Sequence, residues 1–63
     1  MKRGDFVKHL NKHGCHLLRE GSNHAIFQNL KNKKQTSVGR HAELSDLLCK
    51  KICRQLEIPE IKK

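Results

Sequence analysis

The chain has few aromatic side chains and no long apolar run. It contains two phenylalanines, Phe6 and Phe27, and neither tryptophan nor tyrosine. Proteins that hold single-stranded nucleic acid commonly stack bases on exposed rings, so this mode of binding is disfavoured. No apolar stretch approaches the roughly 18 residues of a membrane-spanning helix, and the basic start lacks the apolar segment of a signal peptide. We expect a cytoplasmic protein that does not contact a membrane.

Cysteine is also scarce, and its number and spacing exclude two common uses. The three cysteines are Cys15, Cys49 and Cys53. An odd number argues against a disulfide framework and for a reducing compartment. The cysteines and the pair His9 and His13 do not combine into two halves of a zinc site at the usual spacing. We therefore expect buried apolar cysteines, with neither a metal nor a cofactor.

Acidic residues are few relative to basic ones. Fourteen lysines and arginines stand against six aspartates and glutamates, which gives a formal net charge of +8 over 63 residues. Such a charge attracts polyanions over long range. Nucleic acid, an acidic protein or an anionic membrane surface could each balance it, and of these we expect nucleic acid and an acidic protein. A chain this short forms one domain, residues 1–63, with a thin core. Its site should therefore lie on an open surface and bind something large.

The apolar pattern predicts an α+β fold with the order α-β-β-β-α. A helix is expected over residues 5–13, started by Gly4 or Asp5 and ended by Gly14. Three short strands follow over residues 15–19, 24–29 and 35–38, which suggests an antiparallel meander. A second helix starts after Ser45 as N-cap and stops before Pro59, leaving residues 59–63 as a flexible tail. Each helix buries one stripe, so both should cover one face of the three-stranded sheet.

The faces of these elements follow from their periodicity. In the second strand, Phe27 should lie under the helices together with Ala25 and Asn29, because alternate residues share a face. His24 then lies on the open face, beside the turn formed by residues 20–23. In the second helix, the stripe expected to face the core contains Leu44, Leu47, Leu48, Cys49, Ile52, Cys53 and Leu56.

Histidine at such a position suits the cleavage of RNA. RNA carries its own nucleophile, the 2′-hydroxyl, so a protein needs only a base, an acid and cations near the phosphate. Imidazole titrates near neutral pH and can serve as base or acid. His24 is the first candidate and His41 the second. Residues taken alone leave open the alternative that both are ordinary surface histidines.

Two motifs in matching order resemble the HicA toxin family. They are residues 20–24 (EGSNH), after a short helix that ends in KHG, and residues 38–41 (VGRH), before a helix that runs LCKKICRQL. The similarity covers residues 1 to about 58. It implies a double-stranded-RNA-binding-domain-like fold and an mRNA interferase of a type II toxin–antitoxin pair in bacteria, with His24 as the catalytic residue. The expected RNA-binding residues are Gly21, Ser22, Asn23, Lys33, Lys34, Arg40 and His41.

The resemblance also implies a partner, a HicB-type antitoxin of acidic character that binds the toxin and hinders its active site. Two positions depart from the commonest pattern of the family: Asn23 stands where many members have a second histidine, and Gly39 where many have proline. Because glycine loosens a loop, we expect His41 to be held less firmly than His24. Two alternatives remain, a non-catalytic RNA-binding module and a small protein-interaction domain.

Overall fold

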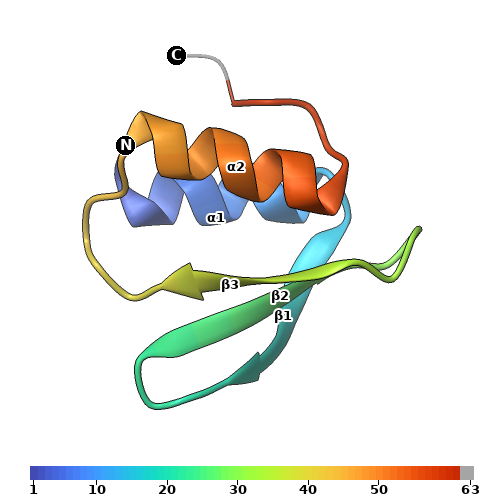
Figure 1. The fold of residues 1–63 in the computed structure, drawn as a ribbon, viewed down its shortest axis with the longest axis horizontal. Coiled ribbons are helices and arrows are strands. Elements are labelled where there is room, and N and C mark those ends of the chain that lie inside the picture. Colours follow the sequence, from blue (N-terminus) through green and yellow to red (C-terminus); the bar gives the residue numbers. More distant parts are fainter. Residues whose placement is uncertain (62–63) are drawn as a thin grey trace.

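The computed structural model describes residues 1–61 and confirms the predicted element order and layers (Figure 1). The elements are α1 (Arg3–Lys12), β1 (Cys15–Glu20), β2 (His24–Asn29), β3 (Gln35–Gly39) and α2 (Asp46–Leu56). The strands form one antiparallel sheet in the order β1-β2-β3. Both helices lie side by side on the same face of this sheet. The other face of the sheet is left uncovered by secondary structure.

The helix ends are partly those expected. Gly14 has a φ of 79°, the left-handed conformation that glycine adopts at a helix C-terminus, and follows α1 as predicted. The predicted start of α1 is wrong, because the helix begins at Arg3 with Lys2 as N-cap and no side-chain cap. For α2 the Ser45 hydroxyl accepts a hydrogen bond from the backbone N–H of Leu48 at 3.1 Å, which confirms the predicted cap.

The register of the sheet confirms the predicted faces of β2. Ala25, Phe27 and Asn29 are buried, whereas His24 is exposed. The pairing of β1 with β2 is interrupted by a bulge between Leu17 and Arg19. A bulge adds one unpaired residue and bends the strand, and every residue of β1 after Cys15 is exposed.

The core is a single cluster between the helices and the sheet. It consists of Phe6, Leu10, Cys15, Ala25, Phe27, Val38, Leu44, Cys49, Ile52, Cys53 and Leu56. All three cysteines are buried, and burial raises the pKa of the Cys15 and Cys53 thiols. Neutral thiols behave as small apolar side chains, which confirms the expected role.

The set of residues predicted to face the core from α2 is larger than the set that is buried. Leu47 is 67% exposed and Leu48 is 40% exposed, although both were expected to face the core. The buried helical positions are Cys49, Ile52, Cys53 and Leu56. These lie at the i, i+3, i+4 and i+7 spacing of one helix face, and Leu47 points away from that face.

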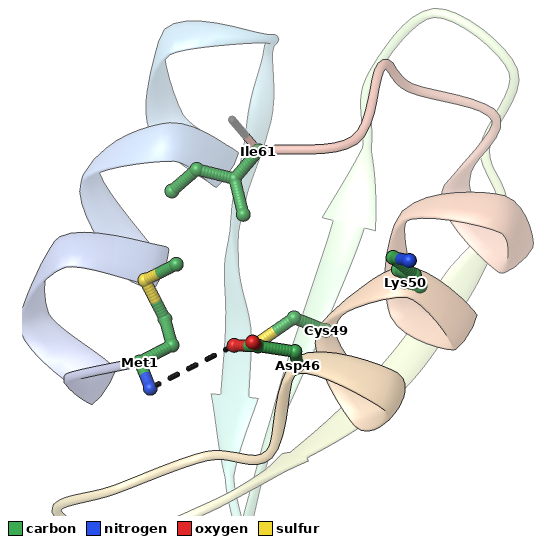
Figure 2. A pocket seen from close by; sticks show the side chains of 5 residues that line it. All are labelled: Met1, Asp46, Cys49, Lys50 and Ile61. Atoms are coloured by element: carbon green, nitrogen blue, oxygen red, sulfur yellow. Dashed lines mark ion pairs between the residues drawn. The ribbon is translucent and has the colours of Figure 1, made fainter. Parts of the chain in front are cut away.

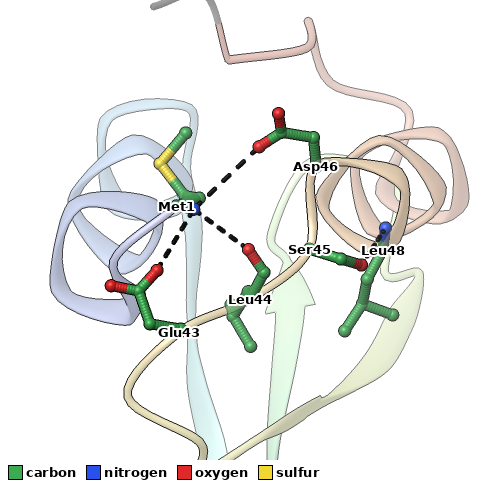
Figure 3. Close-up of polar contacts among 6 residues, drawn as sticks. All are labelled: Met1, Glu43, Leu44, Ser45, Asp46 and Leu48. Atoms are coloured by element: carbon green, nitrogen blue, oxygen red, sulfur yellow. Dashed lines mark hydrogen bonds and ion pairs between the residues drawn. The ribbon is translucent and has the colours of Figure 1, made fainter.

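The segment between β3 and α2 is held against the start of α1. Arg3 N donates to the Ala42 carbonyl at 2.9 Å, and Leu44 N donates to the Met1 carbonyl at 2.8 Å. The nitrogen of Met1 donates to the Leu44 carbonyl at 3.1 Å and lies near the carboxylates of Glu43 and Asp46 (Figure 3). Backbone pairing across a separation of about 40 residues thus orders the connection before α2.

The end of α2 is set by backbone conformation. Glu57 adopts the left-handed conformation with a φ of 57° and is the C-cap, two residues before Pro59. Beyond it, Ile61 packs partly buried against the core, and the Nε2–H of His9 donates to the Pro59 carbonyl at 2.7 Å. The flexible tail expected at residues 59–63 stays a prediction about motion; residues 62 and 63 lie outside the described part.

One buried polar side chain joins the sheet to α2. Asn29 is 4% exposed; its Nδ2 donates to the Leu56 carbonyl at 2.8 Å and its Oδ1 accepts from the Lys31 N–H at 2.9 Å. Because these bonds are shielded from water, we expect Asn29→Ala to lower the free energy of unfolding by about 1–3 kcal/mol. Urea unfolding followed by circular dichroism measures this change.

Asn32 provides the matched control for that measurement. Its Nδ2 donates to the same Leu56 carbonyl at 3.1 Å, but its side chain is exposed. Replacing an exposed amide leaves no unpaired group shielded from water, so Asn32→Ala should cost less than about 1 kcal/mol. Equal losses in the two variants would contradict the structural role assigned to Asn29.

Candidate functional site

An open cleft lies between the β1–β2 turn and the residues at and after the end of β3. The turn and the end of β3 are at the same end of the sheet (Figure 1). Its volume is about 320 Å³, and its lining consists of Ser22, Asn23, His24, Gly39, Arg40 and His41. Five of these six residues are among the predicted site residues. The cleft combines two histidines and an arginine with small polar side chains, on a chain of net charge +8.

His24 and His41 reach the cleft from different elements. His24 is the first residue of β2 and pairs directly with Gly39 of β3. The Cδ2 of His41 lies 3.5 Å from the ideal Cβ position of Gly39, an ordinary van der Waals distance for a side chain at that position. His24 and His41 line the same cleft.

The β1–β2 turn positions Ser22 and Asn23. Gly21 N donates to the His24 carbonyl at 2.7 Å, which closes the turn tightly. This N–H is engaged within the protein and is not available to a phosphate. Gly21, although predicted to bind RNA, therefore shapes the turn, whereas Ser22 and Asn23 line the cleft.

Arg40 is oriented by a carboxylate that the sequence analysis did not single out. Its guanidinium Nη2 lies 2.9 Å from Oε2 of Glu20, and both side chains are about half exposed. An exposed pair of this kind adds about 0–1 kcal/mol to stability, so its main effect is on the direction of the guanidinium. Glu20 ends β1 and Arg40 follows β3, so the pair spans the two edge strands of the sheet.

Arg3 also contacts the segment that carries Arg40 and His41, and the sequence motifs did not indicate this contact. Its Nε donates to the Gly39 carbonyl at 2.9 Å, and its backbone N–H donates to the Ala42 carbonyl at 2.9 Å. The two bonds hold the chain on either side of Arg40 and His41. Arg3 and Gly39 are 36 residues apart, and no local pattern connects them.

The structure does not bring Lys33 and Lys34 to this cleft. They lie in the β2–β3 turn, beyond the opposite end of β2 from His24. The five steps from His24 to Asn29 span roughly 17 Å at about 3.3 Å per residue. Lys34 forms an ion pair with Glu57 instead. These lysines can contact RNA only at a place separate from the cleft.

The described surface has other hollows besides the cleft. A pocket of about 130 Å³ is lined by the apolar side chains of Met1, Cys49 and Ile61 together with Asp46 and Lys50 (Figure 2). Ligand pockets usually measure about 300–1,000 Å³, so this one is small. A second hollow contains His9 and His13, whose ring centroids are 4.5 Å apart.

The histidine pair of α1 serves packing rather than the cleft. Partial burial and the charges of His9 and Lys12 lower the pKa of His13, and His9 already donates to Pro59. Within residues 1–61 no three histidine, cysteine, aspartate or glutamate side chains are grouped so that they could hold a metal ion. No helix in that range is both long and apolar enough to pass through a lipid bilayer.

The cleft is lined by side chains of types that can exchange protons and bind phosphate. Imidazoles can accept or donate a proton near neutral pH, and a guanidinium forms charge-assisted hydrogen bonds to phosphate oxygens. The open shape admits a long chain better than it encloses a small molecule. These properties match the chemistry expected from the motifs around His24 and His41.

Comparison with known proteins agrees with this reading of the motifs. The family described as HicA toxin of bacterial toxin-antitoxin matches residues 3–58. No curated protein and no solved structure matches the chain. The match includes all five helices and strands and every residue that lines the cleft. The chain belongs to the HicA toxin family and is a toxin of a bacterial toxin–antitoxin pair.

Proposed function

We propose that the chain is an mRNA interferase, an endoribonuclease that cuts RNA in the bacterial cytoplasm without a metal ion. The observation that carries the proposal is the cleft in which His24, Arg40 and His41 meet on an open, basic surface. Membership of a toxin family adds that the activity is harmful to the cell.

In this proposal His24 is the catalytic residue. Its imidazole transfers a proton during attack of the RNA 2′-hydroxyl on the adjacent phosphate, while the Arg40 guanidinium binds a non-bridging phosphate oxygen. Ser22 and Asn23 supply hydrogen bonds to the sugar–phosphate backbone from the turn. Lys33 and Lys34 contact a more distant phosphate of the same RNA and add salt-sensitive affinity.

The antitoxin partner is proposed to be a HicB-type protein of acidic character. A toxin with a net charge of +8 attracts a negative surface over long range. An antitoxin that covers the open cleft would exclude RNA without altering the fold. Because the cleft is open to solvent, a partner surface can reach the residues that line it.

The proposal predicts that the purified chain fragments RNA in the presence of excess EDTA. The reason is that the nucleophile belongs to RNA and the proton carriers belong to the protein, so no metal is needed. Denaturing gel electrophoresis of labelled RNA, with 2′-deoxy oligonucleotide of the same sequence as control, measures the cleavage. The 2′-deoxy control should stay intact because it lacks the nucleophile.

The same gel distinguishes the second candidate function. The fold suits a module that holds structured RNA through its phosphates and 2′-hydroxyls without cutting it. Such a module protects RNA from an added nuclease, and its affinity falls steeply with salt. RNA that stays intact and protected would contradict the nuclease proposal and favour the binding module.

A further inference from the structure

We propose that His41 is the second proton-transfer group of the cleft and acts with His24 as an acid–base pair on one phosphate. The inference rests on the proposed RNA cleavage and assigns the group that complements His24. It is drawn from the composition of the cleft, from the pairing of His24 with Gly39, and from two hydrogen bonds of Arg3.

Among the residues that line the cleft, one side chain besides His24 can transfer a proton. Cleavage moves two protons: one leaves the 2′-oxygen and one reaches the 5′-oxygen of the departing nucleotide. Among the lining residues, Ser22 and Asn23 do not ionise near neutral pH, Gly39 has no side chain, and the guanidinium of Arg40 stays protonated. His41 is the remaining lining side chain of a type that exchanges protons near neutral pH.

The pairing of β2 with β3 places the two histidines in one cleft. Residues directly opposite each other in antiparallel strands have Cβ atoms about 4.5–5.5 Å apart. Gly39 lies opposite His24, and the Cδ2 of His41 lies 3.5 Å from the ideal Cβ position of Gly39. His41 therefore contacts the position that faces His24 across the strands. Because both rings line a cleft of about 320 Å³, a phosphate bound in the cleft can contact both.

Two hydrogen bonds from Arg3 hold the segment that contains His41, although the flexible residue Gly39 lies two positions before it. The Nε of Arg3 donates to the Gly39 carbonyl, and its backbone N–H donates to the Ala42 carbonyl, both at 2.9 Å. The chain is therefore fixed one residue after His41 and two residues before it. The looseness expected from Gly39 is removed by contacts from α1, and Arg3 acts as a positioning residue.

The proposed step balances in atoms and charge. The 2′-oxygen forms a bond to phosphorus and loses its proton to one neutral imidazole. The bond between phosphorus and the 5′-oxygen breaks, and that oxygen takes a proton from the other imidazole, which starts as the cation. The products are a 2′,3′-cyclic phosphate and a free 5′-hydroxyl, and solvent then restores the two protonation states.

The test uses RNA whose 5′-oxygen at the bond cut by the wild type is replaced by sulfur. A thiolate leaves without being protonated, so this substrate does not need the acid. On ordinary RNA, His41→Ala and His41→Gln should each cut about 100-fold or more slowly, and the bell-shaped dependence of kcat/KM on pH should lose one limb. One of the two histidines is the acid, and the sulfur substrate does not need it. The alanine variant of that histidine should therefore cut the sulfur substrate at a rate within about tenfold of the wild-type rate.

Two control variants separate proton transfer from other roles. Arg40→Ala should weaken cleavage of both substrates alike and keep the shape of the pH profile, because it removes a phosphate contact. His16→Ala removes an exposed histidine that pairs with Gln28 at the other end of the sheet, and should cut as the wild type does. Circular dichroism checks that every variant is folded.

The outcomes distinguish this inference from the proposed function. If folded His41 variants keep both limbs of the pH profile, or if neither histidine variant is restored by the sulfur substrate, His41 is not the second group although the nuclease proposal stands. If the wild type cuts neither substrate, the nuclease proposal fails, and the assignment of His41 fails with it.

Discussion

Replacing His24 by alanine is expected to slow RNA cleavage about 10²–10⁴-fold, the usual contribution of one general acid–base group. The imidazole is exposed at the start of β2 and lines the cleft, so its loss removes a proton carrier and little packing. The free energy of unfolding should change by less than about 0.5 kcal/mol, as for other surface substitutions. Cleavage rates of a labelled RNA and urea unfolding curves measure the two effects.

Two further variants, His24→Asn and His16→Ala, serve as comparisons for His24→Ala. Asparagine keeps a polar side chain of similar size, but its amide does not act as an acid or base near neutral pH. The rate of RNA cleavage should therefore fall as far in His24→Asn as in His24→Ala. His16→Ala keeps the wild-type rate and controls for the loss of a histidine from the open face. Expression of His24→Ala should be tolerated by cells that the wild type kills. A folded His24→Ala protein that cuts RNA at the wild-type rate would show that the catalytic assignment is wrong.

The largest effect on stability is expected for Phe27→Ala, a loss of about 3–5 kcal/mol. Phe27 is 3% exposed and lies in the central strand under both helices. A domain of 63 residues has a total stability of roughly 3–9 kcal/mol at about 0.05–0.15 kcal/mol per residue. The substitution should therefore leave a large unfolded fraction at 25 °C, which thermal and urea unfolding followed by circular dichroism detect.

Ile26 is the matched control because it is the neighbouring residue on the opposite face of the same strand. It is only partly buried on the open face, so Ile26→Ala should cost about 1 kcal/mol. A loss for Phe27→Ala no greater than that for Ile26→Ala would mean that the helices do not cover the face of β2 assigned to them.

Much of the fold could be predicted because it depends on short-range patterns. Alternation in β2 placed Phe27 in the core and His24 on the open face, since successive side chains of a strand point to opposite faces. Gly14 and Ser45 marked helix ends through their own backbone and side-chain chemistry. The width of the buried stripe of α2 was not predictable in the same way, because the position of the neighbouring elements decides whether a flanking residue such as Leu47 is covered.

The candidate site was predictable only in part. The turn residues and His24 are neighbours in sequence, so one motif contains them. Lys33 and Lys34 were grouped with them on charge alone, but β2 carries the chain away by its full length before the lysines are reached. Gly21 suited a phosphate contact by residue type, but its N–H is engaged by the His24 carbonyl.

The sequence by itself determined the element order, the open face that carries His24, the buried role of the cysteines and a charge suited to RNA. Periodicity, turn chemistry and composition are properties of the sequence itself, so they can be determined without a structure. Only the tertiary structure decided that His41 shares a cleft with His24, that Glu20 directs Arg40, and that Arg3 holds the segment between β3 and α2. These contacts join residues up to 39 positions apart, and they form only when the sheet register and the docking of α1 bring the separate segments together.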